Sequence, residues 1–205
     1  MEKKESMWKN TAILTVITLI AGLLLGFVHD ITAEPIARQE ALTLANGQKA
    51  VFSDAASFEE IALDGDQVEA LLLEEGLTKT NANRLYEAKG EDGGHLGYVV
   101  DVTNMEGYGG DIQILVGIRT SEGEMTINGI DFLSLSETAG MGMKAKEPPF
   151  IDAFHDLSAD AVTVTGEEEG AAKVDAISGA TITSKGVCKA VNAALCVVQM
   201  QEGVL

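Results

Sequence analysis

The stretch T-A-I-L-T-V-I-T-L-I-A-G-L-L-L-G-F-V, residues 11–28, contains no charged side chain. As a helix it would be about 27 Å long, which is close to the thickness of the hydrocarbon core of a bilayer. We therefore predict a transmembrane helix over residues 11–29. A cleaved signal peptide is the alternative, because Ala33 is a small residue at a conceivable cleavage point. The apolar run is longer than the usual signal core of about 7 to 15 residues, which favours an uncleaved anchor.

The charges that flank this run differ between its two sides. Lys3, Lys4 and Lys9 precede it, whereas Asp30 follows it. Basic flanks of a membrane helix are retained in the cytoplasm. We therefore predict a single-pass protein of the cell membrane that contacts lipid through its anchor, with residues 1–10 in the cytoplasm and the rest of the chain outside it.

The composition excludes several kinds of partner and site. After the first nine residues the chain has 11 basic and 30 acidic side chains, a balance that excludes nucleic acid as a partner. Cys188 and Cys196 are eight residues apart in an expected helix. That spacing is about 12 Å along the helix axis, too far for a disulfide, whose α-carbons lie within about 7 Å. The three histidines are scattered, and no cluster has metal-ligand spacing, so we predict no metal site.

The part of the chain after the anchor begins with helical signals and then changes to strands. Residues 30–53 are expected to form a stalk helix, with Pro35 suited to the first turn of a new helix and Asn46 and Gly47 as its expected interruption. Glycine-rich turns then separate short strands. The expected strands are 84–89, 96–104, 111–120, 125–135 and 161–166, and the expected helices are 68–75, 150–157 and 185–199. The predicted fold class is α+β: one N-terminal transmembrane helix, then an extracytoplasmic domain over 54–205 with an antiparallel sheet and flanking helices.

A loop of small residues, D-A-I-S-G-A-T-I-T-S at 175–184, runs directly into the last expected helix. The unpaired amides at a helix start bind anions, and small residues let a phosphate approach the backbone closely. The hydroxyl of Thr181, Thr183 or Ser184 could instead cap the helix, and from spacing alone that is the commoner arrangement. The residues by themselves therefore predict an anion site and nothing more specific.

Within this loop, Ser178, Gly179, Ala180 and Thr181 resemble the S-G-A-T attachment motif of the FMN-binding domain family. In that family the threonine carries FMN through a phosphodiester bond, so the resemblance implies a covalent flavin on Thr181 and a cofactor-binding role for the whole motif. Asp175 matches the acidic residue that opens the sequence recognised by a flavin transferase, which is thereby implied as a maturation partner. Thr181 would be an anchor for the cofactor, and no catalytic residue is predicted.

Two further stretches resemble the same family and occur in its order. The sequence G-Y-G-G at 107–110, followed by L-V-G-I at 115–118, looks like the family's G-Y-G-G and V-G-I strand. The sequence E-T-A-G-M-G at 137–142 resembles its E-T-P-G-L-G loop, which lies against the flavin, although alanine and methionine replace the proline and leucine. Glu137 is a candidate for contacting the polar edge of the flavin. The further cofactor contacts implied are Tyr108, Gly109, Glu137, Thr138, Gly140, Met141 and Gly142.

Nearly the whole chain, including T-A-E-P-I at 32–36, is similar to the G subunits of Rnf complexes. This similarity implies a non-autonomous electron-carrier subunit of an ion-translocating ferredoxin:NAD⁺ oxidoreductase, coupled to Na⁺ or H⁺ transport. The implied partners are the Rnf subunits A, B, C, D and E. The chain has no nicotinamide fingerprint, no iron–sulfur cysteine set and no charge within the apolar helix. NAD, ferredoxin and the ion path are therefore expected in the other subunits.

Other functions remain compatible with parts of the sequence. The C subunit of the sodium-pumping NADH:quinone reductase, or a freestanding FMN-domain electron-transfer protein, would keep the flavin and have different partners. A membrane-stalked ligand-binding module would account for the anchor and the acidic domain but would make no use of S-G-A-T. A hydrolase that uses Ser178 is the weakest alternative, because no G-x-S-x-G elbow surrounds that serine and no partnered histidine is evident.

Overall fold

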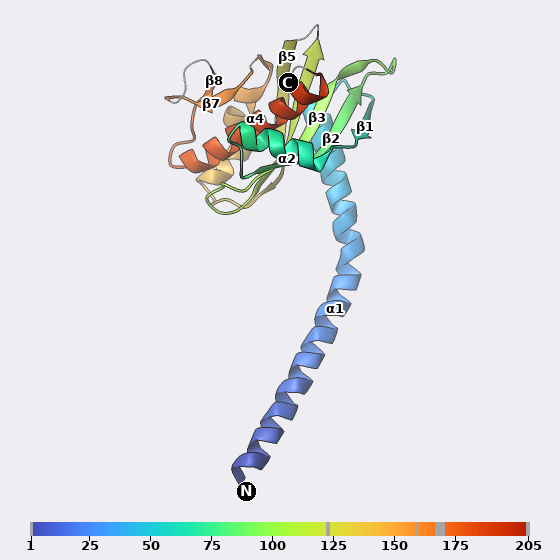
Figure 1. Ribbon diagram of the computed structural model, residues 1–205, viewed down its shortest axis with the longest axis vertical. Helices are drawn as coiled ribbons and strands as arrows, with labels where there is room; N and C mark the ends of the chain where they lie inside the picture. The colour runs from blue at the N-terminus through green and yellow to red at the C-terminus, as the bar shows by residue number, and fades with distance from the viewer. Residues whose placement is uncertain (1, 122–123, 159, 167–170, 204–205) are drawn as a thin grey trace. The chain divides into compact units, whose positions relative to one another are not determined.

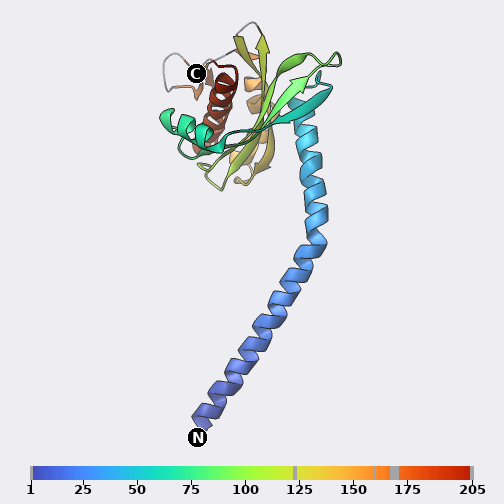
Figure 2. The same cartoon turned by 45° about the vertical axis from the view of Figure 1, so that its right-hand side comes forward.

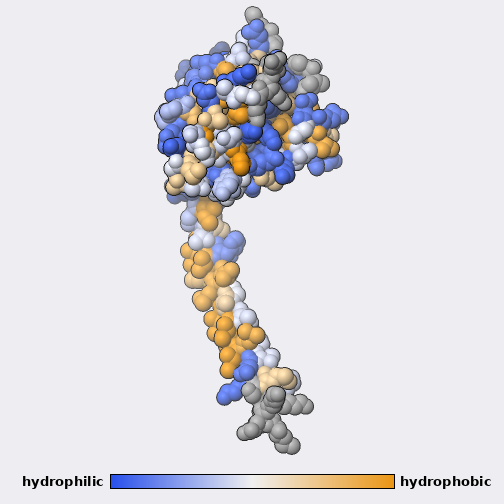
Figure 3. Space-filling model, turned by 90° about the vertical axis from the view of Figure 1, so that its left-hand side faces the viewer, coloured by the Kyte–Doolittle hydropathy of each residue, from blue (hydrophilic) through white to orange (hydrophobic). Residues whose placement is uncertain are grey.

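The computed structural model of the protein describes residues 2–121, 124–158, 160–166 and 171–203. The chain forms two compact units, Met1–Thr43 and Leu44–Leu205. The first unit belongs to helix α1, which extends over Glu2–Val51 (Figure 1). Its large apolar side chains from Ile13 to Val28 are exposed, and Figure 3 shows them covering this part of the helix. Residues 11–28 of α1 carry no charge and are long enough to cross the core of a bilayer, which suits a membrane anchor.

Helix α1 continues without a break through Pro35, Asn46 and Gly47, so the predicted interruption is wrong. Gly47 serves close packing, because a Cβ at this position would lie 2.7 Å from Leu115 Cδ1 and 3.0 Å from Asp131 Oδ2. Glycine weakens a helix locally, but tertiary contacts outweigh that preference. The last turns of α1 therefore belong to the second unit, which begins at residue 44, before the predicted domain boundary at residue 54.

The second unit is built on a six-stranded antiparallel sheet in which each strand pairs with the next in chain order. The strands are β1 (Ser57–Ile61), β2 (Thr80–Lys89), β3 (His95–Asn104), β4 (Ile112–Ser121), β5 (Glu124–Leu135) and β6 (Leu157–Ser158). A separate parallel pair consists of β7 (Val162–Val164) and β8 (Ala172–Val174). The four long strands and β7 confirm the prediction, whereas β1, β6 and β8 were not predicted.

The helices of this unit are α2 (Gly65–Glu74), α3 (Pro148–Ile151) and α4 (Thr181–Gln201), with two 3₁₀ turns, η1 (Gly142–Lys146) and η2 (Asp152–Phe154). The expected helix over 150–157 is wrong in its second half, where the chain leaves η2 and enters β6. Asp156 has a left-handed backbone with φ of +52°, which is incompatible with a continuing helix. Helix α4 begins at Thr181, earlier than the predicted residue 185.

Two layers of side chains cover the two faces of the sheet. On one face, fully buried residues of α4 such as Val191 and Leu195 pack with Val100 and Ile114 in a single cluster, and Figure 2 shows α4 against that face. On the other face, Val51 and Phe52, at and just after the end of α1, pack with residues that alternate with the first set, including Val99 and Leu115. Helix α4 is also apolar, but it is largely buried inside the domain as a core helix. The architecture is α+β, as predicted.

A carboxylate that is hydrogen-bonded at the β2–β3 hairpin makes the free energy of unfolding depend on pH. Glu87 Oε1 accepts from His95 Nδ1 at 2.9 Å, and Lys89 Nζ lies 3.3 Å from Glu87 Oε2. The bond from His95, aided by Lys89, lowers the pKa of Glu87 below its ordinary value of 4.5. A depressed carboxyl pKa contributes stability that is complete above the unfolded value and is lost as the pH falls through the folded value.

We therefore expect the Glu87→Gln variant to lose less stability than the wild type as the pH falls from about 5 to about 3. The measurement is the thermal midpoint as a function of pH, in detergent, for the wild type and the variant. The control is Glu91→Gln, which changes an exposed carboxylate in the turn of the same hairpin. If the thermal midpoints of Glu87→Gln and the wild type fall equally with pH, Glu87 does not cause this pH dependence.

Candidate functional site

The loop before α4 and the first turn of that helix border a cavity of about 530 Å³. Cavities of about 300–1,000 Å³ are typical of sites for small molecules and cofactors. Its walls come from three segments that are distant in sequence: the β3–β4 loop, the chain from the end of β5 into η1, and the start of α4. The lining residues are Tyr108, Glu137, Thr138, Met141, Gly142, Gly179, Ala180, Thr181, Ile182 and Thr183.

The start of α4 presents unpaired backbone amides to this cavity. Ala180 is the N-cap residue and Thr181 the first helical residue, and no side chain caps the helix. The first bond of the helix runs from the Ser184 amide to the Ala180 carbonyl at 3.0 Å. The amides of residues 181–183 therefore have no carbonyl partner inside the helix. Together with the positive end of the helix dipole, they suit an anion.

The three hydroxyl residues considered as caps have different environments. Ser184 is fully buried, and its Oγ donates to the Ala180 carbonyl and accepts from the Ile177 amide, both at 3.0 Å. Ser184 therefore fixes the loop onto the helix. Thr183 is also buried, whereas Thr181 is exposed, and within the described residues its hydroxyl has no hydrogen-bond partner. Thr181 is the residue whose hydroxyl is left accessible at the cavity.

Glycines allow the walls of the cavity to approach one another. A Cβ on Gly142 would lie 2.8 Å from Glu137 Cβ and 2.8 Å from Thr183 Oγ1, so the start of η1 packs directly against the first turn of α4. Gly179 has φ of +79°, a left-handed conformation that favours glycine, and its Cβ position lies 3.4 Å from Met141 Cε. These contacts hold the S-G-A-T loop and the E-T-A-G-M-G loop together around the cavity.

The carboxylate of Glu137 binds the G-Y-G-G loop. The Tyr108 amide donates to Glu137 Oε1 at 2.8 Å, and the Gly109 amide donates to Oε2 at 3.1 Å. Next along the chain, the Thr138 carbonyl accepts from the amides of Met141 and Met143 at 3.1 and 3.2 Å. The predicted contact between Glu137 and the polar edge of a flavin stays a prediction.

Exposed apolar side chains surround the cavity mouth. Tyr108 is 74% exposed, Ile182 52% and Met141 46%, although each of them lines the cavity. Aromatic rings and methionine thioethers form favourable contacts with the face of a flat aromatic ligand. An anion-binding helix start beside an apolar rim therefore fits a phosphate joined to an aromatic ring system, which is the chemical make-up of FMN.

The structure brings most of the predicted site residues to this cavity. Asp175 and Ser178 are exposed and lie outside its lining, and the Asp175 carboxylate accepts from Thr165 Oγ1 at 2.8 Å. Gly140, with φ of +76°, and Gly109 support the lining loops without lining the cavity themselves. Of the lining residues, Ile182 was not predicted, and Thr183 was predicted as a possible helix cap and not as part of a cofactor cavity. The position of both residues in the first turn after Thr181 was the signal that could have placed them at the cavity.

Comparisons with known proteins agree with this site. The model of the FMN-binding domain matches residues 107–196, which include every residue that lines the cavity. The model of the RnfG N-terminal region matches residues 1–49. The G subunit of the Na(+)-translocating ferredoxin:NAD(+) oxidoreductase complex of Acetobacterium woodii is 34% identical over 210 residues, covering 97% of this chain and 98% of the relative. The chain belongs to the RnfG family.

Two further proteins are similar to this RnfG family member. It is 31% identical over 195 residues to the G subunit of the proton-translocating ferredoxin:NAD(+) oxidoreductase complex of Clostridium ljungdahlii, covering 94% of this chain and 91% of that one. It is also similar to the crystal structure of NqrC from Shewanella oneidensis, with 23% identity, a TM-score of 0.46, and coverage of 70% of this chain and 67% of the other. The predicted family and the predicted FMN-binding domain are confirmed.

Proposed function

We propose that this RnfG family member is the G subunit of an ion-translocating ferredoxin:NAD⁺ oxidoreductase and carries electrons on FMN held covalently by Thr181. The observation that carries this proposal is the position of the Thr181 hydroxyl. It is exposed at a helix start that no side chain caps, and it borders a cavity of about 530 Å³ within the FMN-binding domain. The hydroxyl would be esterified to the phosphate of FMN as a phosphodiester.

The surroundings of Thr181 suit that bond. The phosphodiester retains a negative charge, and the amides of residues 181–183 and the dipole of α4 stabilise an anion at this position. The flavin ring would lie against Tyr108, Met141 and Ile182, whose exposed apolar area it would cover. Gly179 and Gly142 let the loops that border the cavity pack closely against each other, which fixes the walls around the phosphate and ribityl chain.

The bound FMN would supply electron transfer, and the protein would supply position and electrostatics. A covalent tether prevents loss of the cofactor from a domain outside the cytoplasm, where we place this one because Lys3, Lys4 and Lys9 precede the apolar part of α1. Asp175 and the exposed S-G-A-T loop would be accessible to a flavin transferase before the flavin covers the cavity.

The partners proposed are the Rnf subunits A, B, C, D and E, with membrane lipid around residues 11–29. The two relatives compared above differ in the ion that their names give, Na⁺ for the one from A. woodii and H⁺ for the one from C. ljungdahlii. Either ion is therefore compatible with the proposal. No charge lies within residues 11–28, so the ion path is assigned to other subunits.

The experiment that tests this function is purification of the tagged chain from native membranes. We expect the other subunits to co-purify, and the band of this chain to fluoresce as a flavoprotein after denaturation. Membranes that lack the chain should lose ferredoxin-dependent NAD⁺ reduction and regain it when the chain is re-expressed. A flavinylated chain that purifies alone would support a freestanding carrier instead, and a chain without flavin would support a ligand-binding module.

A further inference from the structure

The base of the β3–β4 loop is fixed to the rest of the domain. Asn104 is fully buried; its Nδ2 donates to Thr80 Oγ1 at 2.8 Å, and its Oδ1 accepts from the Glu106 amide at 3.0 Å. The Glu106 carboxylate forms an ion pair with Lys189 of α4 and lies 4.0 Å from Lys79 Nζ. The loop therefore starts from a rigid position beside the helix that carries Thr181.

The tip of the same loop is held by the side chain of Glu137. Both of its oxygens accept backbone amides, from Tyr108 and from Gly109. The backbone of the tip also lies directly on this segment, because a Cβ on Gly109 would be 2.3 Å from the Ser136 carbonyl oxygen. Charged acceptors form the stronger hydrogen bonds. The conformation of the tip therefore depends on the carboxylate of Glu137.

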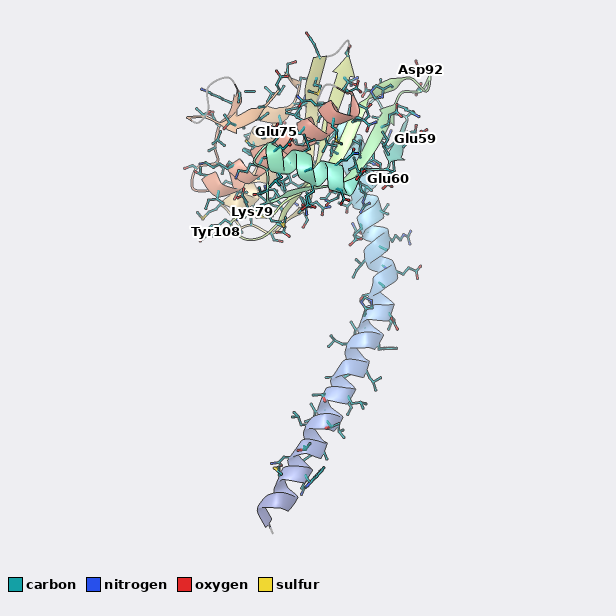
Figure 4. All side chains as sticks on the ribbon, in the orientation of Figure 1. Glu59, Glu60, Glu75, Lys79, Asp92 and Tyr108 are labelled. Atoms are coloured by element: carbon teal, nitrogen blue, oxygen red, sulfur yellow. The ribbon has the colours of Figure 1, made fainter. Side chains whose placement is uncertain are left out.

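The residue that the tip presents is Tyr108, an aromatic ring at the mouth of the cavity. It lines the cavity, is 74% exposed, and projects from the surface of the domain in Figure 4. Within the described residues its ring stacks on no other ring. The Tyr108 side chain is thus held through its backbone amide, lies beside the cavity and is not covered by protein. It is therefore available to stack on a flat ligand.

We propose that Glu137 is a positioning residue: by binding the amides of Tyr108 and Gly109, it holds the Tyr108 ring against the face of the bound flavin. This inference rests on the proposed function, since the flavin is the ligand. Its two oxygens accept the amides of the loop tip, and through them Glu137 acts on the flavin by way of Tyr108.

The first test does not depend on bound flavin. Glu137→Gln preserves the size of the side chain but replaces one acceptor oxygen with an NH₂ group, which faces a backbone N–H. We expect hydrogen–deuterium exchange of residues 105–111 to accelerate at least about tenfold, since a hydrogen bond to a charged group is lost. Exchange in β4 should not change. The matched control is Glu147→Gln, at an exposed glutamate whose side chain caps nothing. Unchanged exchange at the loop in Glu137→Gln would overturn the proposal.

The second test measures flavin fluorescence in the folded protein relative to the same denatured sample, with mass spectrometry confirming FMN in each variant. A stacked tyrosine quenches flavin emission, so Tyr108→Ala and Glu137→Gln should each raise it several-fold. In the Tyr108→Ala background, Glu137→Gln should add nothing. An equal further increase there would show that Glu137 acts on the flavin directly, and this would overturn the proposal. Absence of FMN mass from the wild type would reject the proposed function, while the exchange result would still decide whether Glu137 holds the loop.

Discussion

Replacing Thr181 with alanine is expected to remove all covalently bound FMN from the protein. The phosphodiester requires the threonine oxygen, and the first turn of α4 has no other exposed hydroxyl, because Thr183 and Ser184 are buried. Intact mass spectrometry of the protein from its native host should show an addition of about 438 Da in the wild type and none in the variant. Flavin fluorescence of the denatured band should disappear with it.

Two further variants show whether this loss is specific. Thr183→Ala removes a hydroxyl two residues away and is expected to keep the flavin, whereas Thr181→Ser keeps a hydroxyl at the attachment position and should retain some of it. When both proteins are produced without FMN, the free energy of unfolding of Thr181→Ala should lie within about 0.5 kcal/mol of the wild-type value, since an exposed side chain without hydrogen bonds is removed. If Thr181→Ala keeps the added mass and Thr183→Ala loses it, the tether belongs to Thr183.

The sequence could predict the site only in part, for a physical reason. Spacing around Thr181 indicates a helix start that suits an anion, and this is a local property of the chain. Tyr108, Glu137 and Thr181 meet at one cavity because of the tertiary structure. They were predicted as one site from the resemblance of their motifs to a family, since periodicity gives no such information. The hydrogen bonds from the amides of Tyr108 and Gly109 to Glu137 join the β3–β4 loop to the segment after β5, and no local pattern encodes them.

The fold shows the same division between local and tertiary information. The long strands β3, β4 and β5 were predictable because their apolar residues cover whole segments between glycine-rich turns. Strand β1 reads S-F-E-E-I, an acidic edge strand with few apolar residues, and β8 contains three residues. Both pair with partners that tertiary structure supplies, so their own composition gives little signal.

The role of Gly47 was misread from the sequence. Gly47 was interpreted as a helix interruption, because locally glycine favours turns and helix ends. In the structure its missing side chain lets α1 approach Leu115. Gly117 of β4 serves the same contact from the side of the sheet. Glycines on both sides thus allow the last turn of α1 to lie directly on the sheet.

Gly117→Ala is expected to destabilise the FMN-binding domain by about 2–4 kcal/mol, the sum of overpacking and a disturbed, partly buried hydrogen bond. The added Cβ would lie 2.9 Å from both the Cβ and the carbonyl oxygen of Val51. That carbonyl accepts a hydrogen bond from Asn128 Nδ2, and Phe52 beside it is fully buried. The end of α1 cannot shift without exposing Phe52 and breaking the hydrogen bond to Asn128. Any movement that relieves the overlap therefore costs free energy of its own.

The measurement is denaturant unfolding of the full chain in detergent, together with limited proteolysis after the end of α1. Gly117→Ala should lower the midpoint and speed cleavage near residues 52–56, because the last turn of α1 must lift from the sheet. The control is Gly65→Ala at the start of α2, where no atom lies within 4 Å of the new Cβ and stability should stay level. If Gly117→Ala unfolds like this control, the end of α1 does not rest on the sheet, and the segment that joins the apolar helix to the flavin domain is a free linker.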